Sequence, residues 1–266
     1  MARRARLDAE LVRRGLARSR DQAAELVHAG RVRVAGQRAT KPATAVDAAT
    51  PVLVDADAQD AGYASRGAYK LLGALGEFPG IDIAGRRCLD AGASTGGFTD
   101  VLLRGGARQV VAVDVGYGQL AWSLRTDDRV VVLDRTNVRQ LSPDDIGGPA
   151  DLVVADLSFI SLRLTMPALT VCTAEHGDLL PMVKPQFEVG RARLGAGGVV
   201  RDKDLRADAV RSVAMSAWDC GFGVAGVVAS PLPGPAGNVE FFLWLRRDAP
   251  EPDPAAIAAA VEHGPA

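Results

Sequence analysis

Cysteine, histidine and aromatic residues are scarce in this sequence, and each shortage excludes a class of protein. The 266 residues include 3 cysteines and 3 histidines, and aromatic residues make up 5%. Cys88, Cys172 and Cys220 are far apart and no Cys-x-x-Cys pair occurs, so neither a disulfide framework nor a zinc site is predicted. The histidines do not cluster with them, and we expect no metal. The cysteines are interpreted as small buried residues of a protein in a reducing cytoplasm.

Long apolar runs are also missing. No uninterrupted apolar stretch approaches the roughly 20 residues that a membrane-spanning helix needs. The arginine-rich N-terminus is not followed by the apolar core of a signal peptide. The sequence therefore predicts a soluble, cytoplasmic protein that does not bind membranes.

The net charge of −1 is the sum of two opposite charges on different parts of the chain. Residues 1–41 contain 11 basic side chains, ten arginines and Lys41, against 4 acidic ones, which gives +7. The other 225 residues carry 20 basic and 28 acidic side chains, which gives −8. A basic head thus precedes an acidic body, and such a head is typical of proteins that bind a polyanion.

Residues 5–54 are predicted to form a small unit of two helices followed by short strands. Gly15 is placed to end the first helix, whose apolar residues recur at helical spacing. Ser19 and Gln22 form a capping-box pattern at the start of the second helix, which Gly30 ends. The predicted strands are 32–34 and 51–54.

From about residue 65 apolar strands alternate with helices, which is typical of a mostly parallel sheet covered on both faces. We predict an α/β fold with a seven-stranded sheet. The predicted strands are 87–90, 109–114, 129–133, 151–156, 179–184, 224–230 and 239–245, and the helices include 98–104 and 204–218. The chain is divided into a small α+β domain over 1–59, a linker over 60–64, the α/β domain over 65–247, and an Ala/Pro-rich disordered tail over 248–266.

A glycine-rich turn follows the first strand of the larger domain, where the chain reads Asp90-Ala-Gly-Ala-Ser-Thr-Gly-Gly-Phe98. Asp114 ends the next strand, where a carboxylate can accept hydrogen bonds from ribose hydroxyls. A dinucleotide site would need Gly-x-Gly-x-x-Gly, whereas Asp90 before the first glycine suits the ammonium group of S-adenosylmethionine. We favour S-adenosylmethionine, with contacts from Asp90, Gly92, Ala93, Ser94, Thr95, Gly96, Gly97, Phe98, Asp114 and Asp156.

Charged residues border three further apolar strands, and a fourth lies before the first helix of the larger domain. These residues are Asp156, Lys184, Glu240 and Lys70. A lysine that acts as a general base must be neutral, which requires burial or a neighbouring cation. Lys70 is the candidate cation beside Lys184, and the two carboxylates would orient the amines and a substrate hydroxyl. The set predicts methyl transfer to an alcohol, an in-line displacement in which positioning dominates and no metal is required.

These motifs resemble those of the TlyA family of ribosomal RNA 2′-O-methyltransferases, which were historically labelled hemolysins. The resemblance covers about residues 5–245 and rests on segments 65–71, 89–100, 155–161, 183–188 and 237–241. It implies a Rossmann-like class I methyltransferase domain behind an S4-type RNA-binding domain. It also implies a catalytic tetrad at Lys70, Asp156, Lys184 and Glu240, in which Lys184 is the base toward the ribose 2′-hydroxyl.

The resemblance implies that the substrate is a cytidine in the RNA of one or both ribosomal subunits, and that methylation affects sensitivity to cyclic-peptide antibiotics. We expect a monomer whose basic head pairs with phosphates, while RNA shape and a flipped nucleotide provide specificity. The basic residues around Gly195–Gly198 mark either a loop over the substrate or a solvated surface loop. The expected RNA contacts are Arg3, Arg4, Arg6, Arg13, Arg14, Arg18, Arg20, Arg31, Arg33 and Lys41.

Two other functions are weighed against this one. The hemolysin label suggests a pore-forming protein, but the sequence shows no membrane span, signal peptide or strongly amphipathic apolar helix, which argues against it. A nicotinamide dehydrogenase would bind NAD at residues 92–97. Calorimetry with NAD and with S-adenosylmethionine separates the dehydrogenase from the methyltransferase.

Overall fold

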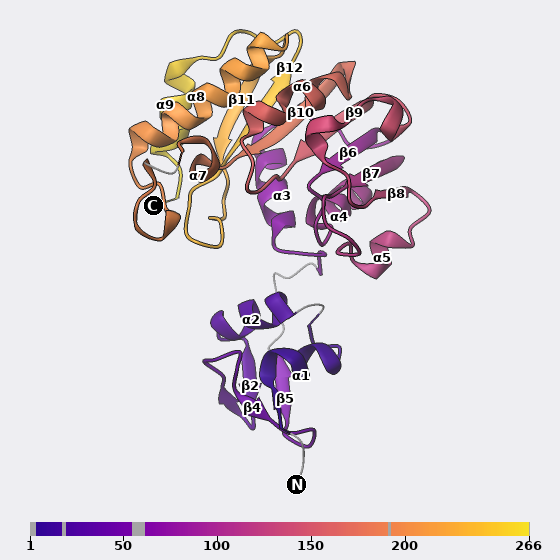
Figure 1. Cartoon of the computed structure of the whole chain (residues 1–266), viewed down its shortest axis with the longest axis vertical. Helices are drawn as coiled ribbons and strands as arrows, with labels where there is room; N and C mark the ends of the chain where they lie inside the picture. The colour runs from indigo at the N-terminus through magenta and orange to yellow at the C-terminus, as the bar shows by residue number, and fades with distance from the viewer. Residues whose placement is uncertain (1–3, 18–19, 55–61, 191–192, 266) are drawn as a thin grey trace. The chain divides into compact units, whose positions relative to one another are not determined.

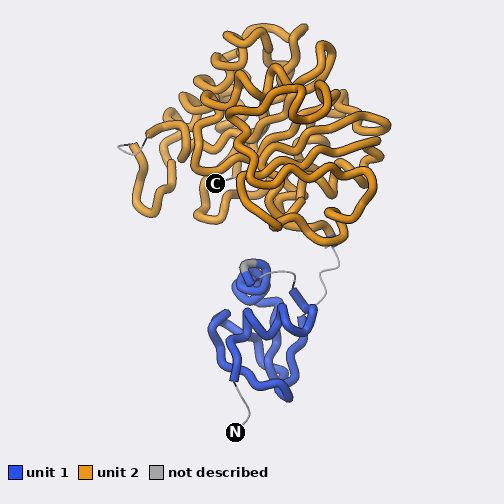
Figure 2. Tube along the Cα trace, turned by 45° about the vertical axis from the view of Figure 1, so that its right-hand side comes forward, with its two compact units in different colours: residues 1–62 blue, residues 63–266 orange. Residues whose placement is uncertain are grey.

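The chain forms two compact units, Met1–Gly62 and Tyr63–Ala266 (Figure 2). The computed structural model describes residues 4–17, 20–54, 62–190 and 193–265. Of the predicted linker over 60–64, the structure describes residues 62–64 but not residues 60 and 61. Arg3, Arg18 and Ser19, for which RNA contacts and a helix cap are predicted, also lie outside the described residues.

The first unit has a small apolar core between two helices and short strands. Leu7, Leu11, Ala23 and Val32 are completely buried in it. The helices end where the sequence predicts, at glycines with positive φ. Strand β2 pairs with β3 and β5, and β1 pairs with β4. The elements are β1 Ala5–Arg6, α1 Leu7–Arg13, α2 Arg20–His28, β2 Val32–Val34, β3 Gln37–Arg38, β4 Ala45–Val46 and β5 Val52–Val54.

The second unit is built on the predicted seven-stranded sheet, in the order β11-β12-β10-β9-β6-β7-β8 (Figure 1). Strands β10, β9, β6, β7 and β8 are parallel to one another, and β12 is antiparallel to both β10 and β11. The α/β fold is therefore confirmed. The strands are β6 Arg87–Ala91, β7 Gln109–Val113, β8 Val130–Leu133, β9 Ala150–Ala155, β10 Thr173–Val183, β11 Gly223–Ala229 and β12 Phe241–Arg246.

Helices cover both faces of this sheet because its strands are apolar on both sides. Leu89 of β6 faces one apolar cluster, together with residues of α6, α8 and α9. Its neighbour Cys88 faces the other cluster, with residues of α3 and α4. The helices are α3 Gly67–Glu77, α4 Gly97–Arg104, α5 Trp122–Arg125, α6 Leu162–Val171, α7 Pro185–Glu188, α8 Lys203–Asp219 and α9 Pro254–Glu262, with short 3₁₀ turns η1 Val138–Gln140, η2 Asp144–Ile146 and η4 Ala196–Gly198.

The C-terminal segment corrects one prediction, because part of the expected disordered tail is helix α9. Asp253 caps this helix by accepting a hydrogen bond from the Ala255 amide at 2.8 Å. Ile257 and Val261 are buried in the same cluster as residues of α8. The alanines that suggested low complexity are strong helix formers, and two apolar residues four positions apart suffice to hold the helix on the sheet.

Candidate active site

The sheet topology brings the predicted site residues to one edge. Asp90, Asp114, Asp156 and Lys184 lie at or just beyond the carboxyl ends of the parallel strands β6, β7, β9 and β10. Glu240 precedes β12, which runs in the opposite direction, so its start lies at that same edge. Val183 pairs with Phe241, the residue after Glu240. This edge is where open α/β sheets bind ligands.

The glycine-rich turn is shaped by two positions that a side chain cannot occupy. Gly92 has φ +89° and Gly96 has φ +97°, a region that favours glycine. A Cβ atom on Gly92 would lie 2.5 Å from the backbone oxygen of Asp156. On Gly96 it would collide with Leu124 and Leu120. Glycine is therefore required here for close packing against neighbouring segments as well as for the turn itself.

Asp114 holds the turn in place and remains available to a ligand. Its Oδ2 accepts a hydrogen bond from the Ser94 amide at 2.8 Å, and its Oδ1 accepts one from the Gly116 amide at 2.7 Å. Ser94 itself has φ +47°, a conformation uncommon outside glycine. A carboxylate has about four acceptor positions, so these two bonds leave capacity for the hydroxyl groups of a ribose.

Asp90 is completely buried, and only one of its two carboxylate oxygens has a hydrogen-bond partner in the described residues. Its Oδ2 accepts a hydrogen bond from the Thr99 hydroxyl at 2.6 Å, whereas Oδ1 has no partner in the described residues. Burial raises the pKa of Asp90 to about 7, opposed by the Thr99 hydrogen bond and reinforced by the nearby negative charge of Asp156. A buried, unpartnered acceptor at this position suits a cationic ligand group. The residues present therefore fit the ammonium group of S-adenosylmethionine.

The four residues of the predicted tetrad form two buried ion pairs. Lys70 Nζ lies 2.5 Å from Glu240 Oε2, and Lys184 Nζ lies 2.5 Å from Asp156 Oδ1. Lys70, Lys184 and Glu240 are each at least nine-tenths buried. Because Glu240 offsets the charge of Lys70, the predicted action of Lys70 as a cation beside Lys184 is weakened. The structure instead assigns one carboxylate to each amine.

Ser158 is a neighbour of Lys184 that the sequence reasoning missed. Lys184 Nζ donates a hydrogen bond to Ser158 Oγ at 2.8 Å. Ser158 follows Asp156 by two residues, so one loop after β9 supplies both partners of this lysine. A serine so close to a predicted catalytic carboxylate was the available signal, but serine is too common for its position alone to indicate a role.

Glu188 is a second residue that the sequence reasoning left without a role, and it fixes the loop that carries Asp156 and Ser158. It is buried on α7, four residues after Lys184. One oxygen accepts a hydrogen bond from Ser161 Oγ at 2.5 Å, and the other accepts one from the Leu162 amide at 2.7 Å. A carboxylate at the first turn of α6 is favoured by the helix dipole. Glu188 thereby ties the end of the Asp156 loop to the segment that bears Lys184.

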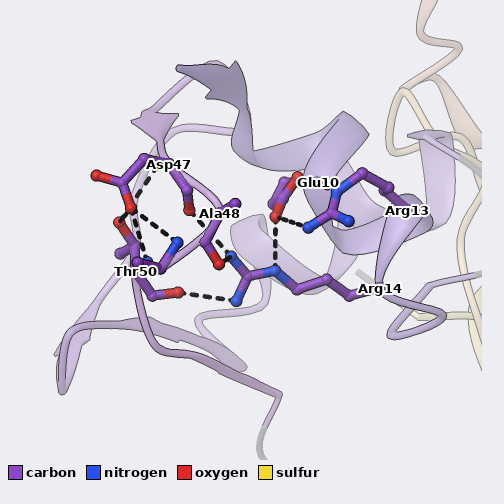
Figure 3. Close-up of polar contacts among 7 residues, drawn as sticks. Glu10, Arg13, Arg14, Asp47, Ala48 and Thr50 are labelled. Atoms are coloured by element: carbon purple, nitrogen blue, oxygen red, sulfur yellow. Dashed lines mark hydrogen bonds and ion pairs between the residues drawn. The ribbon is translucent and has the colours of Figure 1, made fainter. Parts of the chain in front are cut away.

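In the basic head, several arginines are engaged within the unit itself (Figure 3). Glu10 is buried and accepts hydrogen bonds from Arg13 at 2.6 Å and 2.7 Å and from Arg14 at 2.7 Å. Arg14 also donates to the backbone oxygens of Thr50, Asp47 and Ala48. These guanidinium groups lower the pKa of Glu10 to about 2. Arg14 therefore holds the head together, contrary to the prediction of a phosphate contact.

Asp8 is a second buried carboxylate of the head and binds two other predicted RNA contacts. Arg6 and Arg20 form ion pairs with it at 2.7 Å and 3.1 Å. The hydrogen bond from Arg6 holds the pKa of Asp8 well below its usual range. Unlike Arg14, these two arginines remain largely exposed, so pairing with Asp8 orients them at the surface.

The other predicted RNA contacts in the described part of the head differ in exposure. Arg4, Arg33 and Lys41 are exposed, and Arg31 is half-buried. Arg38 is exposed as well, although it was left out of the predicted contacts. It follows β2 across a hairpin, where Arg33 and Arg38 are paired positions. Hairpin pairing thus adds a basic side chain to the surface that carries Arg33.

Comparisons with known proteins agree with this geometry. A family model described as FtsJ-like methyltransferase matches residues 63–247, and a model described as S4 domain matches residues 5–50. The chain belongs to the FtsJ-like methyltransferase family. It is 65% identical over 246 residues to the 16S/23S rRNA (cytidine-2′-O)-methyltransferase TlyA of Mycobacterium tuberculosis, which covers 92% of this chain and 91% of that protein. The resemblance predicted from the motifs is confirmed.

Two further relatives carry a different name. The chain is 36% identical over 237 residues to Hemolysin A of Brachyspira hyodysenteriae, covering 89% of this chain and 97% of that protein. The solved structure of a protein from Streptococcus thermophilus described as a hemolysin superposes with a TM-score of 0.78 at 39% identity. That match covers 98% of this chain and 96% of the other. No helix in the described residues has the length and apolar character needed to cross a membrane.

Proposed function

We propose that this protein transfers a methyl group from S-adenosylmethionine to the 2′-hydroxyl of a cytidine in ribosomal RNA. The observation that carries the proposal is a buried lysine, Lys184, held by Asp156 and Ser158 at the sheet edge that also presents Asp90 and Asp114. The name of the 65% identical relative supports the same reaction and the same nucleotide.

S-adenosylmethionine, when bound, supplies an electrophilic methyl group on a positively charged sulfur. The unpartnered Oδ1 of Asp90 would accept a hydrogen bond from its ammonium group, and Asp114 would bind its ribose. The glycines between Asp90 and Phe98 let this turn pack closely against the Asp156 segment and against Leu120 and Leu124, which places Asp90 and Asp114 beside one another's strands. The carboxylates also match the positive charge of the cofactor.

Lys184 is proposed as the general base, because its amine is buried beside two hydrogen-bond acceptors. A neutral amine has two N–H groups and one lone pair, and Asp156 and Ser158 can accept from both N–H groups. The lone pair is then free to accept the proton of the ribose 2′-hydroxyl while the 2′-oxygen bonds to the methyl carbon. The carbon–sulfur bond breaks, and its electron pair stays on sulfur. The resulting ammonium group is stabilised by Asp156.

Lys70 and Glu240 are proposed to position the acceptor ribose. Their ion pair is almost completely enclosed, with side chains 6% and 1% exposed. Glu240 Oε1 faces Gly234, where a Cβ atom would lie only 2.6 Å away. Because the pair is fixed from both sides, it can orient a hydroxyl group with little loss of side-chain entropy.

Phe159 is proposed to stack on the base of the target nucleotide. Its side chain is 91% exposed, and its φ of +64° is strained for a bulky residue. The ring centroids of Phe159 and Phe187 are 5.3 Å apart. An exposed aromatic next to Ser158 provides a ring face on which a flipped base would stack.

The basic head is proposed to dock on ribosomal subunits through phosphate contacts that weaken with salt. Exposed Arg4, Arg33 and Lys41 are the best placed of its cations, with Arg6 and Arg20 oriented by Asp8. We further propose that the enzyme acts as a monomer in the cytoplasm on one or both subunits. Methylation would then alter sensitivity to cyclic-peptide antibiotics that bind the ribosome.

The test is transfer of tritium from labelled S-adenosylmethionine to purified small and large ribosomal subunits, with the methylated position mapped by mass spectrometry. Lys184→Ala is expected to abolish transfer while cofactor binding persists. The matched control is Lys203→Ala, which removes an exposed lysine that pairs with Glu262. Full activity of Lys184→Ala would refute its role as the base, and calorimetry showing NAD bound in place of S-adenosylmethionine would refute the reaction.

The hemolysin name of two relatives favours a second candidate function, membrane lysis. Dye release from liposomes by the purified protein tests it. Release that is equal in wild type and in Lys184→Ala would support a lytic activity independent of methyl transfer. We expect no release.

A further inference from the structure

Arg206 on helix α8 is a buried arginine without an acidic partner in the described part of the chain. The residue is 8% exposed. Its Nε donates a hydrogen bond to the Val200 backbone oxygen at 2.8 Å, which is the single polar contact of the side chain among the described residues. Burial lowers the pKa of its guanidinium group. A buried cation without a counter-charge is unfavourable, so an anion that completes the site would stabilise it.

The free side of the guanidinium group is not sealed inside the protein. Fully buried side-chain atoms without a hydrogen-bond partner occur in the described residues at Asp90, Gln186 and Asp156, whose atom is ion-paired with Lys184, and none belongs to Arg206. The terminal nitrogens, which lack partners, therefore keep contact with solvent. An arginine has five N–H donors, and one is used on Val200. The remaining fork of donors matches two oxygens of a phosphate group.

The guanidinium group is connected to the predicted catalytic residues through Val200. The Val200 amide donates to Asn238 Oδ1 at 2.9 Å, and Asn238 Nδ2 donates to the Gly198 oxygen at 3.1 Å. Asn238 is buried and precedes Glu240 by two residues. Arg206 and Asn238 thus hold the two sides of one peptide segment, and this segment lies at the edge of the sheet that carries the tetrad.

The charged residues nearest to Arg206 in sequence are of both signs. Arg201, directly after Val200, is exposed. The nearest acidic neighbours in sequence form no ion pair with Arg206 in the described residues. Asp202 Oδ1 accepts hydrogen bonds from the Asp204 and Leu205 amides and so caps α8. Asp204 is exposed to solvent.

We propose that Arg206 is the centre of a subsite that binds a backbone phosphate of the RNA beside the methylated nucleotide. This inference rests on the proposed function, since RNA is the anionic substrate that reaches this edge of the sheet. Two non-bridging oxygens of the phosphate accept hydrogen bonds from the terminal nitrogens of Arg206, and Arg201 adds its charge at the rim. The subsite fixes the acceptor strand next to Lys70 and Glu240 at a place distinct from the basic head.

The test compares wild type, Arg206→Gln and the matched control Arg211→Gln. Arg211 is an exposed arginine of the same helix that pairs with Asp208. Arg206→Gln is expected to raise the KM for ribosomal RNA about tenfold and to reduce the slope of log kcat/KM against log salt by about 1. Cofactor affinity stays unchanged, because no cofactor contact is removed. Arg211→Gln is expected to behave as wild type.

Two further variants separate the charge of Arg206 from its anchoring of the Val200 segment. Asn238→Ala releases the same Val200 segment but keeps the arginine, so it is expected to leave the salt slope as in wild type. Arg206→Lys keeps the charge without the fork and is expected to restore the salt slope while KM remains raised. An Arg206→Gln enzyme with the wild-type salt slope, whatever its melting temperature, would overturn the proposal.

Inorganic phosphate distinguishes the source of the anion. Competitive inhibition against RNA in wild type, lost in Arg206→Gln, supports an RNA phosphate at this position. Phosphate binding that leaves the KM for RNA unchanged would overturn it. Should wild type methylate no RNA, the proposed function fails separately, and filter binding of a ribosomal RNA fragment to wild type and Arg206→Gln still tests the subsite.

Discussion

Binding of S-adenosylmethionine should displace a proton from Asp90 near neutral pH. Burial raises the pKa of this carboxyl group to about 7, so it is partly protonated in the free enzyme. Its Oδ1 has no hydrogen-bond partner within the described part of the chain. An ammonium group beside it favours the ionised form and lowers the pKa, because opposite charges stabilise each other.

The magnitude follows from that pKa. If the ionised form binds, the apparent Kd is raised by the factor 1 + 10^(7 − pH), which is about 11 at pH 6, about 2 at pH 7 and near 1 at pH 8. Affinity should therefore fall about tenfold between pH 8 and pH 6. Over the same range the number of protons released on binding should rise from about 0.1 to about 0.9.

Isothermal titration calorimetry in buffers of different ionisation enthalpy measures both quantities. Asp90→Asn is the control, because it keeps an acceptor for Thr99 but cannot titrate. At pH 6 the amino group of the ligand is already protonated in solution and exchanges no proton on binding, so the difference between wild type and variant isolates Asp90. Proton release by wild type equal to that of Asp90→Asn at pH 6 would refute the reasoning.

The raised pKa of Asp90 also predicts how the free energy of unfolding of the cofactor-free protein changes with pH. A carboxyl pKa that is higher in the folded than in the unfolded protein favours folding at pH below 3.8 and loses this contribution as pH rises through about 7. At pH 8, Asp90→Asn should therefore be more stable than wild type, by at most about 4 kcal/mol. Urea unfolding at pH 5 and pH 8 measures it, and an equal difference at both values would contradict the assignment.

Three other perturbations separate positioning from folding. Ser158→Ala should lower kcat about tenfold at unchanged cofactor affinity, because one hydrogen bond to the proposed base Lys184 is lost. Ser158→Thr keeps the hydroxyl group and is the control, and single-turnover methylation measures both variants. Equal rates for Ser158→Ala and wild type would exclude a role of Ser158 in positioning Lys184. Arg14→Ala should reduce the protection of α1 amides against hydrogen exchange by about tenfold, since Glu10 loses a partner. Arg33→Ala should leave this protection intact and weaken RNA binding. The reverse pattern would show that Arg33 stabilises the head and that Arg14 binds RNA. Removal of residues 254–266 should cost about 3–6 kcal/mol in urea unfolding because Ile257 and Val261 leave the core, and no loss of stability would show that α9 does not contribute.

Much of the site could be predicted because its parts are local sequence patterns. A charged residue at the end of an apolar strand can be recognised without knowledge of its neighbours. A rule about parallel sheets then places all such residues at one edge. Asp90, Asp156 and Lys184 were found in this way. The resemblance to a known family placed the same residues in a tetrad.

Other features depend on partners that are distant in sequence. Glu188 contacts residues 26 and 27 positions away, and nothing in its own segment indicates them. The arginines of the head were predicted as one group from their charge. The structure divides them, because Glu10 and Asp8 are buried beside some of them and not beside others. A count of charges contains no information about which of them are paired.

The sequence by itself determined the α/β class, the order of strands and helices, and the residue types at the edge of the sheet, because apolar periodicity and strand ends are encoded locally. Only the tertiary structure decided the pairing: Lys70 with Glu240 across 170 positions and Lys184 with Asp156 across 28. It also turned the alanine-rich end into helix α9 and left Arg206 buried without a counter-charge among the residues that the structure describes. Burial and pairing are properties of a residue's neighbours in space, and chain folding alone brings those neighbours together.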